Sequence, residues 1–195
     1  GSLMKLVETT ELNSIVIDIK DATGEVVFKE SSRCYVKDLK EFIGELHNEG
    51  IYVIGRISVF QDPSYTKLFP ELAVKKKSDG EVWKDYKGLS FIDVGATLYW
   101  SYIVELSKQA YGIGFDEINY DYVRYPSDGN MQDTLYTWTV GTTTKPEMLE
   151  NFFSHLYENI KDVGVKTSVD LFGMTTTAVN DMNIGQLLEN TLPYF

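Results

Sequence analysis

The sequence predicts an α/β fold in which parallel strands alternate with helices. Four apolar runs rich in β-branched residues have the composition of buried strands. The segments between them show helical spacing of their apolar residues or a helix-capping pattern. No hairpin motif separates the runs, and strands that alternate with helices pair in parallel through right-handed crossovers. A chain of 195 residues can bury the core of one such domain.

The first two strands are predicted near the N-terminus. A short helix over Leu3–Glu8 precedes the first strand, Ser14–Lys20, whose apolar run ends in charge. Apolar residues at helical spacing predict a helix over Tyr35–Glu49, and Gly50 stands where that helix would stop. The second strand is predicted over Ile51–Phe60.

A polar loop follows the second strand and carries Trp83 and Asp85, on a kind of segment that often carries function. Asp93 is the expected N-cap of a helix over Ala96–Tyr111. The third strand is predicted over Phe115–Val123, after two glycines that break the helix.

A second long loop, rich in Gly, Ser, Thr and Asn, leads into the next helix. Thr144 and Glu147 form a capping-box pattern, which predicts a helix from there to about Asp162. A fourth strand and a final helix are predicted over Val165–Phe172 and Asp181–Asn190.

The composition limits the class of partner. A formal net charge of −11 and a pI near 4.6 repel phosphate backbones, so we expect no nucleic-acid partner and a neutral substrate. No run of about 18 apolar residues could cross a bilayer. The single cysteine, Cys34, cannot form an internal disulfide and is expected to be a passive thiol. Gly1 and Ser2 are expected to be the remnant of a cleaved tag.

Acidic residues stand at the ends of three of the four predicted strands, namely Asp18, Asp121 and Asp170. Because the carboxyl ends of parallel strands lie on one face of a sheet or barrel, we expect these side chains to converge. Any one of them could instead cap a helix or pair with an arginine, and Arg124 is a candidate partner for Asp121. Repeated charge at strand ends nevertheless favours a functional site, since unpaired charges are costly to bury.

Alternation along the strands assigns these side chains to faces. Asn119 and Asp121 share the inward face of the third strand, and Asp170 lies on the inward face of the fourth. Asp116 falls on the opposite face and is expected to be structural, whereas Glu117 lies deeper on the inward face.

Two inward carboxylates on adjacent strands fit the hydrolysis of a glycosidic bond, in which one acid protonates the leaving oxygen and another group attacks or activates water. Asp121 is the expected nucleophile or base and Asp170 the expected acid, although the acid could come from a strand outside this chain. Aromatic faces pack on the C–H faces of sugars, and polar groups bind hydroxyls. The side chains expected to bind substrate are Asp18, Lys20, Arg56, Trp83, Asp85, Asn119, Arg124, Tyr125 and Phe172.

Two other classes of barrel fit the same strand pattern. A barrel that binds glycans at the cell envelope without cleaving them would keep the aromatic residues but would not need two carboxylates. A phosphate-binding barrel is disfavoured by the acidic charge. No metal or cofactor is expected, because Gly112-Ile-Gly114 lacks the third glycine of a dinucleotide loop and Ser127–Asn130 lacks the acidic ligands of a calcium loop.

The segment GFDEINYDYVRYPSDG, which begins at Gly114, resembles the signature of a bacterial family described as "Putative glycosyl hydrolase domain". The segments NSIVIDIKDATG from Asn13, GIYVIGRISVFQDP from Gly50 and VDLFG from Val169 are similar to other parts of that family. The long loop from Leu72 is also similar to it. The resemblance implies a TIM-type (β/α) barrel related to the α-amylase and α-galactosidase groups, and an O-glycosyl hydrolase activity on a carbohydrate.

The resemblance also implies roles for the strand-end residues. Asp121 matches the position of the nucleophile in the wider set, where Asn119 replaces an arginine. Asp170 falls on the strand where amylase-like enzymes carry a glutamic acid as the proton donor.

The family pattern includes strands before Leu3 and after Phe195, so residues 1–195 are expected to form a fragment of one barrel domain, with about four of the usual eight strands. Open sheet edges expose unpaired backbone groups, and we therefore expect a dimer or a swapped assembly. The resemblance favours an extracellular or cell-envelope location.

Overall fold

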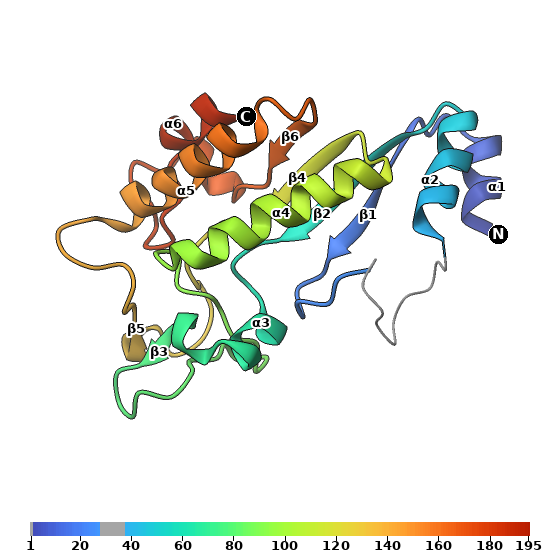
Figure 1. Cartoon of the computed structure of the whole chain (residues 1–195). Helices are drawn as coiled ribbons and strands as arrows, with labels where there is room; N and C mark the ends of the chain where they lie inside the picture. Colours follow the sequence, from blue (N-terminus) through green and yellow to red (C-terminus); the bar gives the residue numbers. More distant parts are fainter. Residues whose placement is uncertain (1, 28–37) are drawn as a thin grey trace.

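A four-stranded parallel sheet forms the centre of the molecule in the computed structural model, which describes residues 2–27 and 38–195 (Figure 1). The strand order is β1-β2-β4-β6, and every pair of neighbours is parallel. This arrangement confirms the predicted α/β class. The strands are β1 (Ser14–Lys20), β2 (Tyr52–Ser58), β4 (Glu117–Asp121) and β6 (Lys166–Val169).

Helices cover one face of this sheet (Figure 1). Branched and aromatic side chains that alternate along the strands, such as Val53, Ile57 and Ile118, are fully buried in the main core cluster. The helix α4 runs along the sheet between α2 and α5, with which it makes contacts. The long helices are α1 (Ser2–Thr9), α2 (Leu39–Asn48), α4 (Thr97–Ile113) and α5 (Lys145–Ile160).

The opposite face of the sheet is open to solvent. On β1 the alternate residues Ser14, Val16 and Asp18 are exposed, and the side chain of Val16 is 58% exposed. The matching residues of β2 and β4 are only half-buried. In a (β/α) barrel this is the face that points toward the interior, so the residues predicted to point inward lie on an accessible surface.

The two segments predicted as loops form a lobe of their own at the carboxyl ends of the strands (Figure 1). They contain α3 (Pro63–Leu68), the 3-10 helices η1 (Pro70–Leu72) and η2 (Met131–Asp133), and an antiparallel pair of β3 (Lys75–Lys76) with β5 (Thr134–Leu135). Elements of two or three residues carry too little periodicity for a sequence pattern to reveal them.

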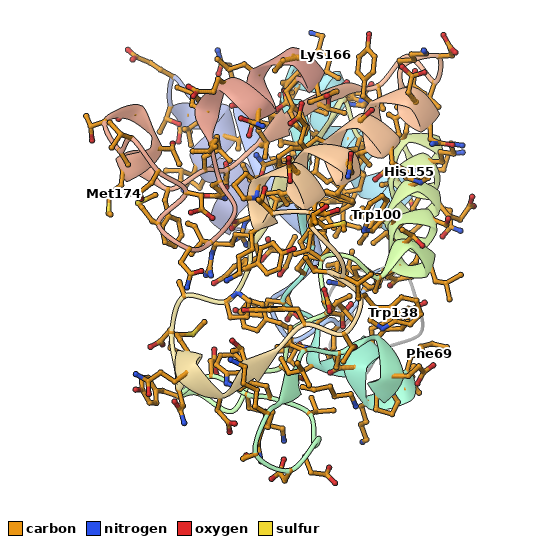
Figure 2. The ribbon with its side chains drawn as sticks, turned by 90° about the vertical axis from the view of Figure 1, so that its left-hand side faces the viewer. Phe69, Trp100, Trp138, His155, Lys166 and Met174 are labelled. Atoms are coloured by element: carbon orange, nitrogen blue, oxygen red, sulfur yellow. The ribbon has the colours of Figure 1, made fainter. Side chains whose placement is uncertain are left out.

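The side chain of Asp93 joins the two segments of this lobe. Its carboxylate accepts hydrogen bonds from the backbone N–H of Gly95 at 3.1 Å and of Trp138 at 2.8 Å, and from Thr139 Oγ1 at 2.8 Å. Trp138 in turn donates from Nε1 to the carbonyl of Glu71 at 2.8 Å, and it lies between the helical layer and the lobe in Figure 2. The prediction that Asp93 caps α4 is therefore wrong.

The last predicted helix, over Asp181–Asn190, is also wrong for most of its length. The carboxylate of Asp181 accepts hydrogen bonds from the backbone N–H groups of Asn183 and Gly185, both at 3.1 Å, and Met182 and Asn183 have positive φ angles of 50° and 62°. A side chain that binds nearby backbone groups in this way competes with helix formation. Only α6 (Leu188–Thr191) overlaps the predicted helix, and the chain after β6 also contains η3 (Gly173–Thr176) and η4 (Leu192–Tyr194).

Two further predictions concern Cys34 and membrane crossing. The hypothesis that Cys34 is a passive thiol lies outside the described residues. Within residues 2–27 and 38–195, no helix has the length and apolar character that a membrane crossing requires.

Candidate active site

Asp121 and Asp170 lie at the carboxyl ends of neighbouring strands. Asp121 is the last residue of β4, and Asp170 directly follows β6. The parallel pairing of β4 with β6 continues to this point, because the N–H of Asp170 donates to the carbonyl of Tyr120 at 2.9 Å. Both carboxylates line one small cavity of about 50 Å³, together with Tyr122, Arg124, Leu171, Phe172 and Gln186.

Arg56 of β2 holds Asp121 in place. The Nε of Arg56 donates to Asp121 Oδ2 at 3.1 Å, and Nη2 donates to the same oxygen. Nη1 of the same guanidinium binds Asp18 Oδ1 of β1 at 2.9 Å, so one arginine bridges two strand-end carboxylates. Partial burial works to lower the pKa of Arg56, but its hydrogen bonds to the carboxylates of Asp18 and Asp121, together with their charges, outweigh it and raise this pKa above its ordinary value.

The residue after Asp121 adopts a strained backbone conformation. Tyr122 has a φ of 53°, in the left-handed region that a tyrosine rarely occupies. This turn aims the N–H of Tyr122 at Asp121 Oδ1, at 2.6 Å. Asp121 is thus surrounded by hydrogen-bond donors on both oxygens, and strain of this kind is concentrated at functional sites.

Asp170 belongs to a second chain of contacts on the same face. Its Oδ1 accepts a hydrogen bond from Asn119 Nδ2 at 3.1 Å, and Asn119 also donates to Ser168 Oγ at 3.1 Å. Ser168 donates to Glu117 Oε1 at 2.5 Å, and Tyr52 donates to Glu117 Oε2 at 3.0 Å. Burial and the hydrogen bond to Glu117 raise the pKa of Tyr52 to about 12.

These contacts agree with the predicted faces of the third strand. Asn119 and Asp121 share the open face, and Glu117 lies on the same face two residues before Asn119. Asp116 points the other way, where it accepts hydrogen bonds from Val53 N at 2.7 Å and pairs with His47 Nε2 at 2.9 Å.

Arg124 does not pair with Asp121, contrary to the partner suggested by sequence. Its guanidinium carbon lies 4.8 Å from the ring centre of Phe172, 5.1 Å from that of Tyr122 and 5.9 Å from that of Phe91. Its Nη1 donates to the carbonyl of Tyr125 at 3.1 Å and to Ser127 Oγ at 3.0 Å. Arg124 also lines a second cavity of about 190 Å³.

Among the residues predicted to bind substrate, Asp18, Arg56, Asn119, Arg124 and Phe172 lie on or beside the open face. Asp85 lines the second cavity, and its Oδ1 accepts hydrogen bonds from the N–H groups of Lys87 and Leu89 at 2.8 Å each. No sequence pattern pointed to Gln186, which is buried, accepts a hydrogen bond from Phe172 N and donates to the Val123 carbonyl.

Three other predicted substrate-binding residues are buried in the core. Lys20 has no exposed surface, because an irregularity between Asp18 and Lys20 shifts the register of β1 and turns the lysine away from the open face. Trp83 is 2% exposed and donates from Nε1 to the carbonyl of Asn130 at 3.0 Å. Tyr125 is 0% exposed, with its hydroxyl 2.8 Å from Thr139 Oγ1. All three side chains are thus engaged inside the fold, Lys20 in an ion pair with Asp62 and the two aromatic residues in apolar clusters.

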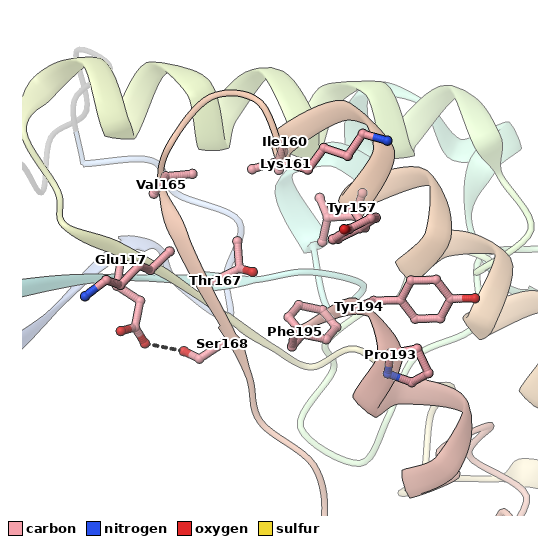
Figure 3. A pocket seen from close by; sticks show the side chains of 12 residues that line it. Glu117, Tyr157, Ile160, Lys161, Val165, Thr167, Ser168, Pro193, Tyr194 and Phe195 are labelled. Atoms are coloured by element: carbon pink, nitrogen blue, oxygen red, sulfur yellow. Dashed lines mark hydrogen bonds between the residues drawn. The ribbon is translucent and has the colours of Figure 1, made fainter.

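A larger cavity than these two lies elsewhere, along the free edge of β6 (Figure 3). It encloses about 680 Å³ between β6, the end of α5 and the last three residues. Glu117 and Ser168 reach it, and Figure 3 shows the hydrogen bond between them. Neither Asp121 nor Asp170 lines it, so its size does not mark it as the catalytic centre.

In the described part of the chain, no group of three or more His, Cys, Asp or Glu side chains is arranged to hold a metal ion.

Comparison with solved structures identifies similar folds. A hypothetical protein from Ruminiclostridium thermocellum ATCC 27405 is 31% identical, with a TM-score of 0.75 over 88% of this chain and 90% of that chain. An α-galactosidase from Thermus thermophilus is 12% identical, with a TM-score of 0.60 over 86% of this chain and 33% of that chain. An α-L-fucosidase from Paenibacillus thiaminolyticus is 16% identical, with a TM-score of 0.62 over 93% of this chain and 30% of that chain.

The chain thus spans about a third of the length of these two glycosidases, and at such low identity the likeness shows the fold alone. That fold is the TIM-type barrel, of which the four parallel strands form a part. No curated protein sequence gives a significant match. The family is nevertheless clear, because its model matches residues 1–194: the chain belongs to the family described as "Putative glycosyl hydrolase domain".

Proposed function

We propose that this chain carries the catalytic carboxylates of a glycoside hydrolase that cleaves O-glycosidic bonds in a polysaccharide. The observation that carries the proposal is the placement of Asp121 and Asp170 on adjacent strand ends, where both line one cavity. Glycosidic hydrolysis requires two carboxyl groups on either side of one bond. Family membership and the glycosidase folds of the structural neighbours support the same reaction class.

The surroundings of the two carboxylates favour different roles. Asp121 meets only donors, from Arg56 and from the N–H of Tyr122, which hold both of its oxygens in place, and this environment suits a nucleophile or base. Asp170 is exposed, and only its Oδ1 has a partner among the described residues. Its Oδ2 is free to carry the proton that the leaving oxygen needs, so Asp170 is the proposed acid.

The substrate would rest on side chains around these carboxylates. Asp18 and Asn119 offer polar groups along the open face, and Phe172 offers a ring that is 38% exposed. Such pairs of polar groups and rings are suited to sugar hydroxyls and C–H faces.

Binding without cleavage is the second candidate. The small volume between Asp121 and Asp170, about 50 Å³, favours it, because little space is left there for a sugar ring. A glycan-binding barrel would use the same open face and would not depend on proton transfer from Asp170.

The test is the substitution Asp121→Asn, assayed on 4-nitrophenyl glycosides and on a panel of polysaccharides. We expect turnover to fall by about 10³-fold or more, because loss of a nucleophile or base removes the reaction path.

Asp170→Asn should lose much less activity on 4-nitrophenyl glycosides, whose leaving group needs no proton, than on polysaccharides. Asp162→Asn, at the exposed end of α5, is the matched control and should keep full activity. Unchanged turnover in Asp121→Asn would contradict the hydrolase proposal. Glycan binding by the wild-type protein without any turnover would support the second candidate.

A further inference from the structure

Arg124 has hydrogen-bonding capacity that the described residues do not use. Only its Nη1 has partners, the carbonyl of Tyr125 and the hydroxyl of Ser127. Its Nε and Nη2 make no hydrogen bond within residues 2–27 and 38–195, and neither is sealed from solvent. The side chain lines both the cavity of Asp121 and Asp170 and the neighbouring cavity of about 190 Å³.

The guanidinium is also without a counter-ion. No carboxylate in the described part of the chain lies within 4.0 Å of Arg124, whereas Arg56 nearby pairs with two. Burial lowers the pKa of Arg124, and the charges of Asp121, Asp128 and Asp85, which lie beyond 4.0 Å, work against this shift. The position of Arg124 is set by aromatic rings on three segments instead of by an acid.

A planar guanidinium with two free donors on one side matches the two oxygens of a carboxylate. Sugar hydroxyls could use the same donors, but they would not neutralise the charge. A ligand that supplies a carboxylate would satisfy both the free donors and the missing counter-ion of Arg124.

The surrounding loop is basic although the whole protein is acidic. Residues 63–92 contain six lysines and four acidic residues, in a chain of formal net charge −11. Lys87 lines the cavity of Arg124. Lys67 and Lys84 line a further cavity of about 300 Å³ on the other side of the turn over residues 84–90, and no acidic residue contributes to its lining. The cavity of Arg124 itself is lined by Asp85 and Asp128 as well as by Lys87, so the free donors of Arg124, and not an excess of positive charge, would select an anionic group there.

We infer that Arg124 determines specificity for acidic polysaccharides by binding the carboxylate of a uronic acid unit next to the cleaved linkage. The inference rests on the proposed hydrolase function for the position of that linkage. It differs from the neutral substrate expected from net charge, because direct hydrogen bonds from the free donors of Arg124 act at shorter range than the net charge of the chain. Arg124 contacts substrate in this scheme and takes no part in proton transfer.

The experiment measures binding by ligand-observed NMR, with methyl glucuronide and methyl galacturonide compared with the matching methyl glucoside and galactoside. The wild-type protein should bind the acidic member of at least one pair about tenfold more tightly or better, as one or two charge-assisted hydrogen bonds would give. Arg124→Gln should abolish the preference. Lys108→Gln removes the same charge from an exposed position on α4 and should leave the preference unchanged.

Equal binding of acidic and neutral sugars, no uronate binding, or a preference that survives in Arg124→Gln each overturns the inference. A 6-O-sulfated galactoside serves as a further arm, and tighter binding of sulfate than of carboxylate also overturns it. The proposed reaction is judged separately with Asp121→Asn, which should retain the uronate preference while losing turnover. Uronate binding through Arg124 without turnover of any glycan would retain the binding inference and reject the hydrolase.

Discussion

Lys20 is the charged residue whose surroundings differ most from those predicted. Its ammonium lies 3.0 Å from Asp62 Oδ2, and it also donates to the carbonyls of Ser58 and Val59. Tyr99 completes the group by donating to Asp62 at 2.8 Å. Burial lowers the pKa of Lys20 even though Asp62 works to raise it. The group ties the end of β1 to the chain that leaves β2.

We expect Lys20→Met to lower the free energy of unfolding by about 3–5 kcal/mol, because it leaves the carboxylate of Asp62 buried without its partner. Urea denaturation followed by circular dichroism measures the change. The double variant Lys20→Met with Asp62→Asn should be less destabilised than the sum of the two single variants. Lys108→Met, at an exposed position, is the control, and a loss in Lys20→Met as small as that of the control would contradict the expectation.

Alternation along strands predicted the facing of Asn119 and Asp121 correctly, because both lie on an uninterrupted strand. The burial of Lys20 was not predicted, since the irregularity after Asp18 changes the facing by one residue. The burial of Trp83 was not predicted either, because nothing local reveals that a loop tryptophan packs on Phe91 and under Gly129. Partners far apart in sequence, such as Arg56 and Asp121, depend on strand order and lie beyond a local pattern.

At the scale of elements, α5 is the helix whose start was best predicted. Thr144 accepts from the N–H of Glu147, while the carboxylate of Glu147 accepts from Thr144 N at 2.7 Å and Oγ1 at 2.8 Å. These hydrogen bonds lower the pKa of Glu147 below its ordinary value of 4.5. The helix α5 carries Phe152 and Phe153, which are buried in the core, so its start matters for the sheet as well.

The lowered pKa of Glu147 sets the direction of a pH effect. A carboxyl group whose pKa is lower in the folded chain stabilises that chain above the unfolded pKa, near 4.5, and this contribution is lost as the pH falls through the folded pKa. We therefore expect Glu147→Gln to lower the urea midpoint at neutral pH and to approach the wild type as the pH falls through the folded pKa of Glu147. Glu45→Gln, on the exposed face of α2, should show no such trend. A constant difference across the pH range would mean that the charge of Glu147 is not the cause.

The elements differ in how well sequence defined them, for physical reasons. β1 was predicted with its observed bounds, because its seven residues form an apolar, β-branched run that ends in charge, which is typical of a buried strand. The pair of β3 with β5 was missed because each strand has two residues and its partner lies in another loop. The false helix over Asp181–Asn190 had suitable apolar spacing, but Asp181 binds the backbone of its own turn.

At the scale of the whole molecule, the sheet has two free edges. Within residues 2–27 and 38–195, β1 has β2 as its strand neighbour and a single bridge from Lys20 to Val26, and β6 has β4 as its strand neighbour. Edges of this kind present unpaired backbone groups to a second chain. We expect this protein to form a dimer or a swapped assembly in solution, measured by light scattering after size-exclusion chromatography. Val16→Lys, which adds a charge beside the β1 edge, should shift the population toward monomer. A wild-type protein that is monomeric at all concentrations would contradict the expectation.

The bonds from Asp93 across the lobe have a consequence for how a ligand would enter. The buried carboxylate of Asp93 binds both the segment before α4 and the segment before α5. The loops above the strand ends are therefore held together before a ligand binds. A glycan arriving there would lose its own freedom but would not have to immobilise these loops, which reduces the entropy cost of association. We therefore expect a glycan to bind this domain with little movement of these loops.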